Sequence, residues 1–565
     1  MRPAPERLMS TDTGKSTSLG ASKSARLVWV GLVAVVLGGA TVLGFIFRSA
    51  TDTPTPPQLT ALALSPSRIQ LSWSLSRAAG VTRYRVLRNR AAINETTRTT
   101  FIDTGLKTGT PYEYKVTVLD AAGRVSVASS PITATTRGMD PSSVYPLKVG
   151  PTRRYLVDQR NVPFMIVGDS PQAMTVNLSI ADAGKFFANR RSAGYNSMWV
   201  NLLCIICTSL VGGRTDGTTY DGIPPFRIPG DLSTPNEAYF ARVDRMIGLA
   251  EKYGILLFLN PIETAGWLQV LRSNGVRKSY DYGRYLGERY RKLRNIVWFH
   301  GNDFQSWRTR SDTELAQAVA RGIKAAPSMH LHTVELNYLV SSSLDDQSWR
   351  PLIKIDAVYT YRPTYAELLK EYNLRGFLPT VMIEANYEFE SWHYPTDLET
   401  LRRQEYWTML SGASGQFYGN KYTWQFLKDW QDQLDSPGSR QMAYATKFFG
   451  GKPWFKLIPD QQHNVVTTGY GTFASGGAIN DNDYVTAART PDGKLVIAYI
   501  PETRTITVDL RKLSGRVWAS WYDPTNGTSA AISGSPFLNR GAKQFRPPGE
   551  NGDGDGDWVL VLTTP

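Results

Sequence analysis

The sequence is short of the residues that metal sites and histidine-based active sites need. Its 565 residues include only 2 cysteines and 5 histidines. Cys204 and Cys207 form one CxxC pair with no second pair beside it, so a four-ligand zinc site is not expected. The stretch SLVGGRTDG follows the pair, where a thioredoxin-like motif requires a helix N-terminus. The two side chains are therefore either small buried residues or a disulfide.

Signatures of nucleotide-binding proteins and serine hydrolases are missing as well. No GxGxxG or GxxxxGK[ST] motif opens a predicted helix, and no GxSxG elbow presents a serine. The formal net charge is +14, but lysine and arginine are scattered among acidic residues without a basic helix. We therefore expect no nucleic acid, metal ion or organic cofactor. The positive charge indicates a solvated basic surface, which is also compatible with an anionic polysaccharide.

One long hydrophobic run occurs near the start of the sequence. Residues 27–47 carry no charge and are long enough to cross a bilayer. Basic residues precede this run and only Arg48 follows it closely, so residues 1–26 are expected in the cytoplasm and the remainder outside. Arg48 would also occupy the third position before a cut after Ala50, which disfavours cleavage. We expect an uncleaved membrane anchor and an extracytoplasmic, periplasmic or extracellular, catalytic part, with secretion after cleavage as the alternative.

A Pro/Thr-rich linker over residues 48–56 leads into a segment of short alternating strands over residues 57–137. Several short strands divided by turn signals predict a β-sandwich. The segment resembles a fibronectin type III module in the placement of four residues that are expected in its core, namely Trp73, Tyr84, Leu106 and Tyr112. Tyr112 stands where such modules have a tyrosine corner. The module is expected to act as a spacer or in adhesion.

From about residue 165, predicted strands alternate with amphipathic helical stretches such as EAYFARVDRMIGLAEKYG. The strand candidates are residues 164–169, 195–203, 255–262, 296–303, 330–336, 357–361, 379–388 and 415–420. This alternation is typical of a parallel sheet, and eight such strands close a barrel. We predict a (β/α)8 TIM barrel within residues 143–459. A doubly wound sheet is the alternative, although the phosphate-binding signatures of that fold are missing.

The chain returns to short strands after a helix that begins in LDSPGSRQM. The stretches DYVTAART, KLVIAYI, TITVDL, VWASWYDPTNG and DWVLVLT predict a second β-sandwich over residues 460–565. The acidic stretch ENGDGDGDW lacks the spacing and closing glutamate of an EF-hand, so we expect a hairpin tip there. The predicted chain is therefore multidomain, with a transmembrane helix and a barrel flanked by two β-sandwiches.

Side chains at the C-terminal ends of barrel strands meet at one rim, here called the mouth. The polar residues at these predicted ends are rich in carboxylates: Asp169, Asn201, Glu263, Asn302, Asp303, Glu335, Tyr361, Glu384 and Asn420. Carboxylates without metal ligands suit glycoside hydrolysis, which needs one protonated acid and one anion. Asp303 and Glu384 end strands four and seven and are the predicted pair. Burial and repulsion from Glu384 would keep Asp303 protonated, so Asp303 is the expected acid/base and Glu384 the nucleophile.

Residues 143–465 resemble the apiosidase-like glycoside hydrolases. The matching pieces are FMIVGDSPQ, IVWFHGND, PTVMIEANYE, SGASGQFYGN followed by Trp424, and LDSPGSRQM leading to KPWFKLIPDQ. The resemblance implies a barrel related to the large retaining clan, with Asp303 as the acid and Glu384 as the nucleophile. The C-terminal stretches WYDPTNGT and DWVLVL are similar to the small sandwich that often follows these barrels and is labelled collagen-binding-like.

Three positions depart from the family pattern around the predicted sugar site. Asn302 replaces a usual glycine and resembles the Asn-acid pair of the wider clan, in which the asparagine holds a sugar 2-hydroxyl. HTVELNYLVSSS stands where the family tends to have a His-Pro segment, and Gln416 stands where a histidine is common. The resemblance therefore implies glycoside hydrolysis without fixing apiose as the sugar.

We expect hydrolysis of a glycosidic bond in a plant or microbial polysaccharide by double displacement. The residues expected to bind substrate are Asp169, Asn201, Asn302, Glu335, Tyr361, Tyr387, Tyr418 and Trp424, of which the aromatic ones can stack on sugar faces. One alternative is a cell-surface carbohydrate-binding or adhesion protein whose barrel has lost catalysis. Another is a glycosyltransferase or transglycosylase that uses the same pair. A pure binder needs no acid facing a nucleophile, which favours the enzyme.

Overall fold

The computed structural model describes residues 36–37, 40–41, 57–65, 68–75, 81–107, 109–120, 125–136, 141–207, 215–336, 340–390 and 396–564. The predicted anchor over residues 27–47 lies outside these residues except for β1 (Val36–Leu37) and β2 (Ala40–Thr41), which pair antiparallel. Within the described ranges, no helix is both long and apolar enough to cross a bilayer. The predicted transmembrane helix is therefore not supported.

The strands that follow form two sheets, in one of which β5 pairs antiparallel with β6 and β8. One has the order β3-β4-β7 and the other β6-β5-β8-β9. Their bounds are β3 Leu59–Ser65, β4 Arg68–Trp73, β5 Val81–Arg88, β6 Ala91–Thr96, β7 Thr100–Asp103, β8 Pro111–Asp120 and β9 Ile132–Thr135. The buried rings of Trp73 and Tyr84 lie 5.6 Å apart. The hydroxyl of Tyr112 accepts a hydrogen bond from the backbone N–H of Lys107 at 2.8 Å, as a tyrosine corner requires.

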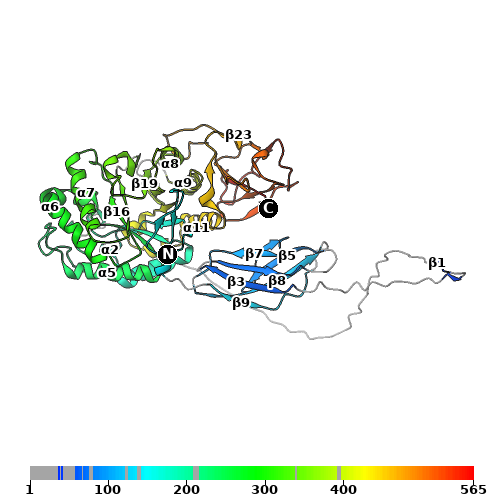
Figure 1. The fold of residues 1–565 in the computed structure, drawn as a ribbon, viewed down its shortest axis with the longest axis horizontal. Coiled ribbons are helices and arrows are strands. Elements are labelled where there is room, and N and C mark those ends of the chain that lie inside the picture. The colour runs from blue at the N-terminus through cyan, green and yellow to red at the C-terminus, as the bar shows by residue number, and fades with distance from the viewer. Residues whose placement is uncertain are drawn as a thin grey trace, which may run out of the picture. The chain divides into compact units, whose positions relative to one another are not determined.

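A barrel of eight parallel strands follows in the described part of the chain (Figure 1). Its strands are β13 (Ile166–Asp169), β14 (Ser197–Asn201), β15 (Leu256–Asn260), β16 (Ile296–Gly301), β17 (Leu331–Glu335), β19 (Asp356–Thr360), β20 (Thr380–Glu384) and β21 (Gly415–Tyr418). Neighbours pair in parallel from β17 back to β13, and from β13 through β21 and β20 to β19. The carbonyl of His332 in β17 accepts from the N–H of Lys354 just before β19 at 2.9 Å, which closes the ring. The barrel prediction is therefore confirmed over the doubly wound alternative.

The strands form because their residues are apolar on both faces, as expected for a parallel sheet covered on both sides. Every residue of β14, β15 and β16 is buried. Inside the barrel, the rings of Phe258 and Phe417 meet edge to face at 4.9 Å. A Cβ atom on Gly168 would lie 2.3 Å from the Phe417 ring, so β13 needs a glycine there. The barrel interior is thus a close-packed core, so residues that act on a substrate are expected at the rim of the barrel.

Helices surround the strands on the outside (Figure 1). They are α3 (Ile180–Ala193), α5 (Glu237–Lys252), α6 (Thr264–Tyr290), α7 (Arg310–Ala325), α8 (Thr364–Asn373) and α9 (Leu398–Leu410), with α10 (Lys421–Gln425) and α11 (Pro437–Gly450) after β21. Between β17 and β19 the described chain has a short strand β18 (Val340–Ser342) and two 3-10 turns. This is the unit for which the sequence contains no amphipathic helical stretch.

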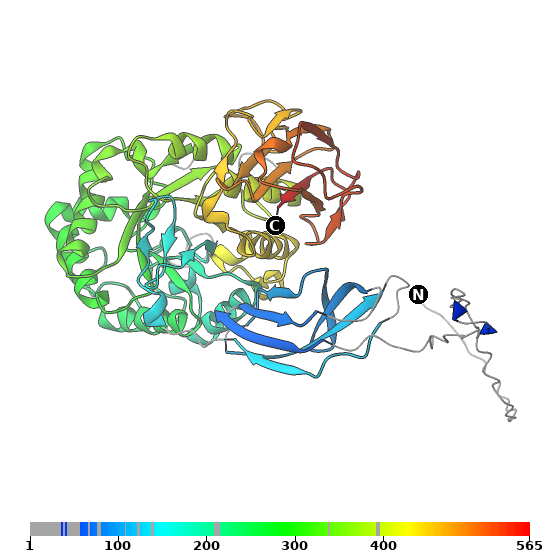
Figure 2. The ribbon, with the colours of Figure 1, turned by 45° about the vertical axis from the view of Figure 1, so that its right-hand side comes forward.

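The C-terminal strands form a second sandwich, coloured orange to red in Figure 2. One sheet has the order β22-β24-β25-β30-β27-β28 and the other β23-β26-β29. The bounds are β22 Ile458–Pro459, β23 Val466–Thr468, β24 Thr486–Arg489, β25 Leu495–Ile500, β26 Ile506–Asp509, β27 Trp518–Tyr522, β28 Ser529–Ala531, β29 Ala542–Phe545 and β30 Trp558–Thr563.

The acidic stretch ENGDGDGDW is not the hairpin tip that the sequence predicted, because β29 and β30 belong to different sheets. This loop instead binds Arg402 of helix α9. The fully buried guanidinium of Arg402 contacts the carboxylate of Asp557 at 2.8 and 2.9 Å and that of Asp553 at 3.3 Å. Asp555 is a third partner. The loop therefore fastens the C-terminal sandwich to the barrel.

Candidate active site

The run IVWFHG ends at the mouth because the backbone turns sharply into the left-handed region. Gly301, Asn302 and Asp303 have φ angles of 87°, 80° and 46°. A Cβ atom on residue 301 would lie 1.8 Å from the carbonyl oxygen of Glu335, so only glycine fits there. Positive φ is uncommon outside glycine, although asparagine and aspartate tolerate it better than most residues, and such conformations cluster at functional sites. The turn brings Asp303 beside the end of β17, where its N–H donates to Oε1 of Glu335 at 3.4 Å.

Glu384, the last residue of β20, is held by three phenol groups. Oε1 of Glu384 accepts hydrogen bonds from the hydroxyls of Tyr359 at 2.8 Å and Tyr361 at 2.7 Å. Oε2 accepts from the hydroxyl of Tyr387 at 3.1 Å. The Nε2 group of Gln172 donates to Tyr387 at 3.1 Å, which directs the Tyr387 hydrogen to Glu384. Three O–H donors on one carboxyl group favour its ionised form.

Asp303 and Glu384 interact electrostatically. Burial raises the pKa of Asp303 to about 6, although the nearby Tyr359 hydroxyl has a lowering effect. Burial, and then the charge of Asp303, raise the pKa of Glu384 to about 8 against the lowering effect of Tyr361 and Tyr359. The two carboxyl groups therefore hold at least one proton near neutral pH. Since Glu384 has the higher pKa, these values by themselves place that proton on Glu384 rather than on Asp303.

The hydrogen bonds decide which carboxyl group keeps the charge. Glu384 has three phenol donors. The buried Oδ1 atom of Asp303 has no hydrogen-bond partner among the described residues. An ionised carboxylate oxygen without hydrogen-bond donors is costly to bury. A protonated carboxyl group carries no charge, and it can donate its hydrogen to an acceptor when a substrate binds. The arrangement favours a protonated Asp303 beside an ionised Glu384.

A polar chain joins the loop of Asp303 to the cradle of Glu384. Nδ2 of Asn201, at the end of β14, donates to Oδ1 of Asn302 at 2.9 Å and to Oε1 of Gln172 at 3.4 Å. Nε1 of Trp199 donates to Oδ1 of Asn201 at 2.9 Å, which fixes the orientation of that amide. Since Gln172 also binds Tyr387, both carboxyl groups are positioned by one buried network.

Glu335 is the third carboxyl group at this place. Its side chain is fully buried at the end of β17. Burial, followed by the charges of Glu384 and Asp303, raises the pKa of Glu335 well above its ordinary value. The structure thus brings together Asp303, Glu384, Glu335, Tyr361, Tyr387, Asn201 and Asn302 among the residues predicted from the sequence.

Three other predicted substrate-binding residues are committed to partners away from the pair. Asp169 forms a fully buried ion pair with Arg190 of α3. The hydroxyl of Tyr418 donates to Glu388, and Nε1 of Trp424 donates to Oε1 of Glu390 at 2.6 Å. The polar groups of Asp169, Tyr418 and Trp424 therefore serve the framework behind the mouth, and the expectation that they face the sugar gains no support from these contacts.

Sequence reasoning missed Tyr359 and Gln172. Tyr359 lies two residues before Tyr361, so both side chains project from the same face of the chain, and this period of two was available as a signal. Gln172 lies in the stretch FMIVGDSPQ, three residues beyond the end of β13. No pattern in the sequence connects Gln172 to Tyr387, because the contact joins residues 215 positions apart.

Cys204 and Cys207 form a disulfide in the segment after β14. The sequence had left this open. Sγ of Cys204 lies 3.5 Å from Nδ2 of Asn201, so the bridge borders the polar network of the mouth. A crosslink at this point restricts the loop that follows Asn201.

An exposed aromatic side chain follows Glu384 closely in the sequence. Phe389, five residues after Glu384, is 44% exposed and has a φ of 67°, a conformation that bulky side chains rarely adopt. Its ring meets that of Tyr422 at 5.5 Å in an edge contact. Tyr387, Glu388 and Glu390 on either side are buried.

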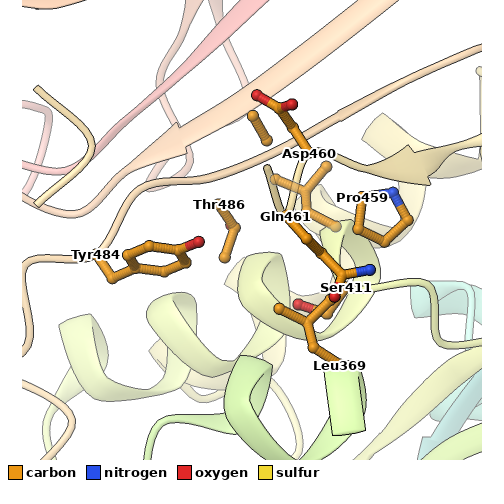
Figure 3. A pocket seen from close by; sticks show the side chains of 9 residues that line it. Leu369, Ser411, Pro459, Asp460, Gln461, Tyr484 and Thr486 are labelled. Carbon is orange, nitrogen blue, oxygen red and sulfur yellow. The ribbon is translucent and has the colours of Figure 1, made fainter. Parts of the chain in front are cut away.

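Two features away from the mouth do not belong to the site. A small pocket between α8, α9 and the C-terminal sandwich is lined by residues such as Leu369, Tyr484 and Thr486, and contains none of the predicted site residues (Figure 3). Asp345, Glu367 and Glu371 lie close enough together to hold a cation, but Nζ of Lys370 already lies 2.8, 2.7 and 3.4 Å from their oxygens.

Comparison with protein families gives three matches. Residues 151–456, more than half of the chain, match the family described as apiosidase-like, catalytic domain. Residues 473–563 match a putative collagen-binding domain of a collagenase, and residues 52–135 match the fibronectin type III domain. These are the families that the sequence motifs resemble.

Solved structures share the fold at low identity. A chain titled glycoside hydrolase aligns with a TM-score of 0.63 over 75% of this chain and 98% of its own, at 22% identity. A glycoside hydrolase family 5 structure from Bacteroides vulgatus aligns with a TM-score of 0.63 over 74% and 93%, at 21% identity. These likenesses establish a barrel architecture.

Similarity to curated proteins is confined to short segments. Exoglucanase B of Cellulomonas fimi is 33% identical over 132 residues, which are 22% of this chain and 12% of that protein. Chitinase Chi52 of Paenibacillus xylanexedens is 36% identical over 97 residues, 16% of this chain and 18% of that protein. The chain thus spans less than a fifth of the length of either relative.

Proposed function

Since the chain belongs to the apiosidase-like family of glycosidases, we propose that it hydrolyses a glycosidic bond of a plant or microbial polysaccharide with retention of anomeric configuration. Asp303 is the acid/base and Glu384 the nucleophile. No metal or organic cofactor takes part in the two steps, which use only these carboxyl groups and water.

In the first step, ionised Glu384 attacks the anomeric carbon while Asp303 gives its proton to the leaving glycosidic oxygen. The C–O bond to the leaving group breaks and a glycosyl ester forms on Glu384. The phenol donors of Tyr359 and Tyr361 keep Glu384 ionised before attack. In the second step, Asp303 takes a proton from water, the water oxygen bonds to the anomeric carbon, and Glu384 leaves as a carboxylate.

The observation that carries this proposal is the electrostatic coupling of two buried carboxyl groups around Tyr359. The Tyr359 hydroxyl donates to Oε1 of Glu384 at 2.8 Å and also lowers the pKa of Asp303. The charge of Asp303 in turn raises the pKa of Glu384. Retaining enzymes have carboxyl groups about 5 to 5.5 Å apart and inverting enzymes about 6.5 to 9.5 Å apart. Two carboxyl groups that both interact with one hydroxyl suit the closer, retaining arrangement.

Sugar recognition draws on the groups around the pair. Oδ1 of Asn302 is held by Asn201, which orients Nδ2 of Asn302 to donate to a sugar hydroxyl next to the anomeric carbon. The exposed ring of Phe389 offers a face on which a neighbouring sugar unit can stack.

The test is release of reducing ends from pectic, arabinan and bacterial exopolysaccharide fragments by the purified protein. We expect release from at least one class, with none from Glu384→Gln at equal folded concentration. Co-sedimentation with a polysaccharide that is never cleaved would instead identify a carbohydrate-binding protein, the alternative suited by the two β-sandwiches.

We also propose that the barrel works outside the cytoplasm. The disulfide between Cys204 and Cys207 supports an oxidising compartment, and the basic residues before the apolar run at residues 27–47 support export. Protease added to intact cells should degrade the barrel if this is right. Protection of the barrel until the cells are lysed would contradict it.

A further inference from the structure

Glu335 has a buried carboxyl oxygen with no function in the mechanism above. Oε1 of Glu335 accepts the N–H of Asp303 at 3.4 Å. Oε2 is buried and has no hydrogen-bond partner among the residues that the structure describes. Within the described part of the chain, Glu335 therefore has one oxygen bonded to the Asp303 loop and one buried oxygen without a partner.

An ionised Glu335 would be poorly placed. Its side chain is fully buried, and the titratable groups that face it are Asp303 after β16, Tyr359 of β19 and Glu384 of β20. None of these three groups is positive. Among the described residues, a third negative charge here would gain neither a cation nor a second hydrogen-bond donor, and such a charge is costly to bury.

A protonated Glu335 fits the same surroundings. Its Oε1 still accepts the N–H of Asp303, while its Oε2–H becomes a donor without an acceptor in the described protein. Buried donors of this kind are expensive unless a partner arrives, and a sugar hydroxyl oxygen is the partner that a glycosidase mouth receives.

We propose that Glu335 remains a neutral carboxylic acid throughout the catalytic cycle, holding the Asp303 loop through Oε1 and donating its Oε2–H to a hydroxyl oxygen of the bound sugar. This inference rests on the proposed glycosidase function. It makes Glu335 a substrate-binding and positioning residue, distinct from the acid/base and from the nucleophile.

Glutamine reproduces the neutral form, because its carbonyl can accept the N–H of Asp303 and its amide can donate to the sugar. We expect Glu335→Gln to keep kcat/KM within about threefold of the original protein. Glu335→Leu has a similar volume but no polar group, and should lose about ten- to hundredfold, in line with a buried hydrogen bond lost. A Glu335→Gln variant as impaired as Glu335→Leu, or a fully active Glu335→Leu, would overturn the proposal.

A second measurement needs no substrate, so it separates this inference from the proposed function. If the pKa of Glu335 is higher in the folded state than its unfolded value of about 4.3, its contribution to stability is complete below that pH and is lost as the pH rises. Glutamine does not titrate. The Tm of Glu335→Gln minus that of the original protein should therefore increase between pH 4 and pH 8. A difference that stays constant or decreases would mean that Glu335 is ionised in the fold, which contradicts the proposal even if no substrate is ever found.

Discussion

Removing the hydroxyl of Tyr359 is the most direct perturbation of the site, because this group donates to Glu384 and also lowers the pKa of Asp303. Tyr359→Phe removes this hydroxyl and keeps the ring, which is 2% exposed and packed inside the barrel. The hydrogen bond to Glu384 is 2.8 Å long and joins a buried carboxylate. Hydrogen bonds to charged groups contribute about 1.5–3 kcal/mol, so kcat/KM should fall about ten- to 150-fold.

The same substitution should also shift the pH dependence of kcat/KM in a definite direction. A donor on a carboxylate stabilises the ionised form, so its removal raises the pKa of both Glu384 and Asp303. Glu384 must be ionised and Asp303 protonated in the first step. Both limbs of the bell-shaped dependence of kcat/KM on pH should therefore move to higher pH in Tyr359→Phe.

The assay is the kcat/KM profile from pH 4 to 9 on any substrate that the original protein cleaves. Tyr145→Phe is a matched control, since its buried hydroxyl donates to the carbonyl of Gly254 at 3.0 Å before β15, at the opposite end of the barrel. That variant should lose about 1 kcal/mol of stability and no activity. An unshifted profile in Tyr359→Phe, or an equal loss in the control, would refute the reasoning.

Three further outcomes are expected. Asp303→Asn should stop cleavage of a natural polysaccharide. It should still allow Glu384 to be glycosylated by a substrate whose leaving group needs no proton, which stopped-flow absorbance would detect as a burst. An equal loss of activity on both substrates would contradict the role of Asp303 as the acid. Phe389→Ala should raise KM for oligosaccharides and leave KM for a monosaccharide aryl glycoside unchanged. The control Trp518→Ala, which removes a half-exposed ring of β27, should change neither KM value. Arg402→Met should lower the free energy of unfolding by about 3–5 kcal/mol in urea titrations, because the buried carboxylate of Asp557 loses the cation of its ion pair. A loss below about 1 kcal/mol would mean that the ion cluster contributes little to stability.

The architecture of the barrel could be predicted because its signal is repeated along the chain. Eight apolar runs and the helical stretches between them occur at the expected spacing, and strand ends locate the mouth without knowledge of any contact. Asp303 and Glu384 follow from this placement alone. The sharp end of IVWFHGND, which suggested an acid at a strand end, corresponds to three consecutive left-handed residues.

Pairings between distant residues could not be predicted in the same way. Asp169 looks like a site residue from its strand end, but its charge is satisfied by Arg190 on a helix, and no pattern distinguishes a committed carboxylate from a free one. The acidic loop before β30 resembled a hairpin tip because its partner, Arg402, lies more than 150 residues earlier. The long apolar run at residues 27–47 predicted a membrane helix, whereas its described residues are the short strands β1 and β2.

The central claim is that Glu384 becomes covalently bonded to the sugar while Asp303 serves as the acid/base. Slowing the second step with Asp303→Asn in the presence of a substrate with a good leaving group should allow the glycosyl-enzyme to accumulate, and peptide mass spectrometry can locate it. We expect one sugar mass on the peptide that contains Glu384. An adduct on another residue, or turnover to a product of inverted anomeric configuration with no adduct, would contradict the account.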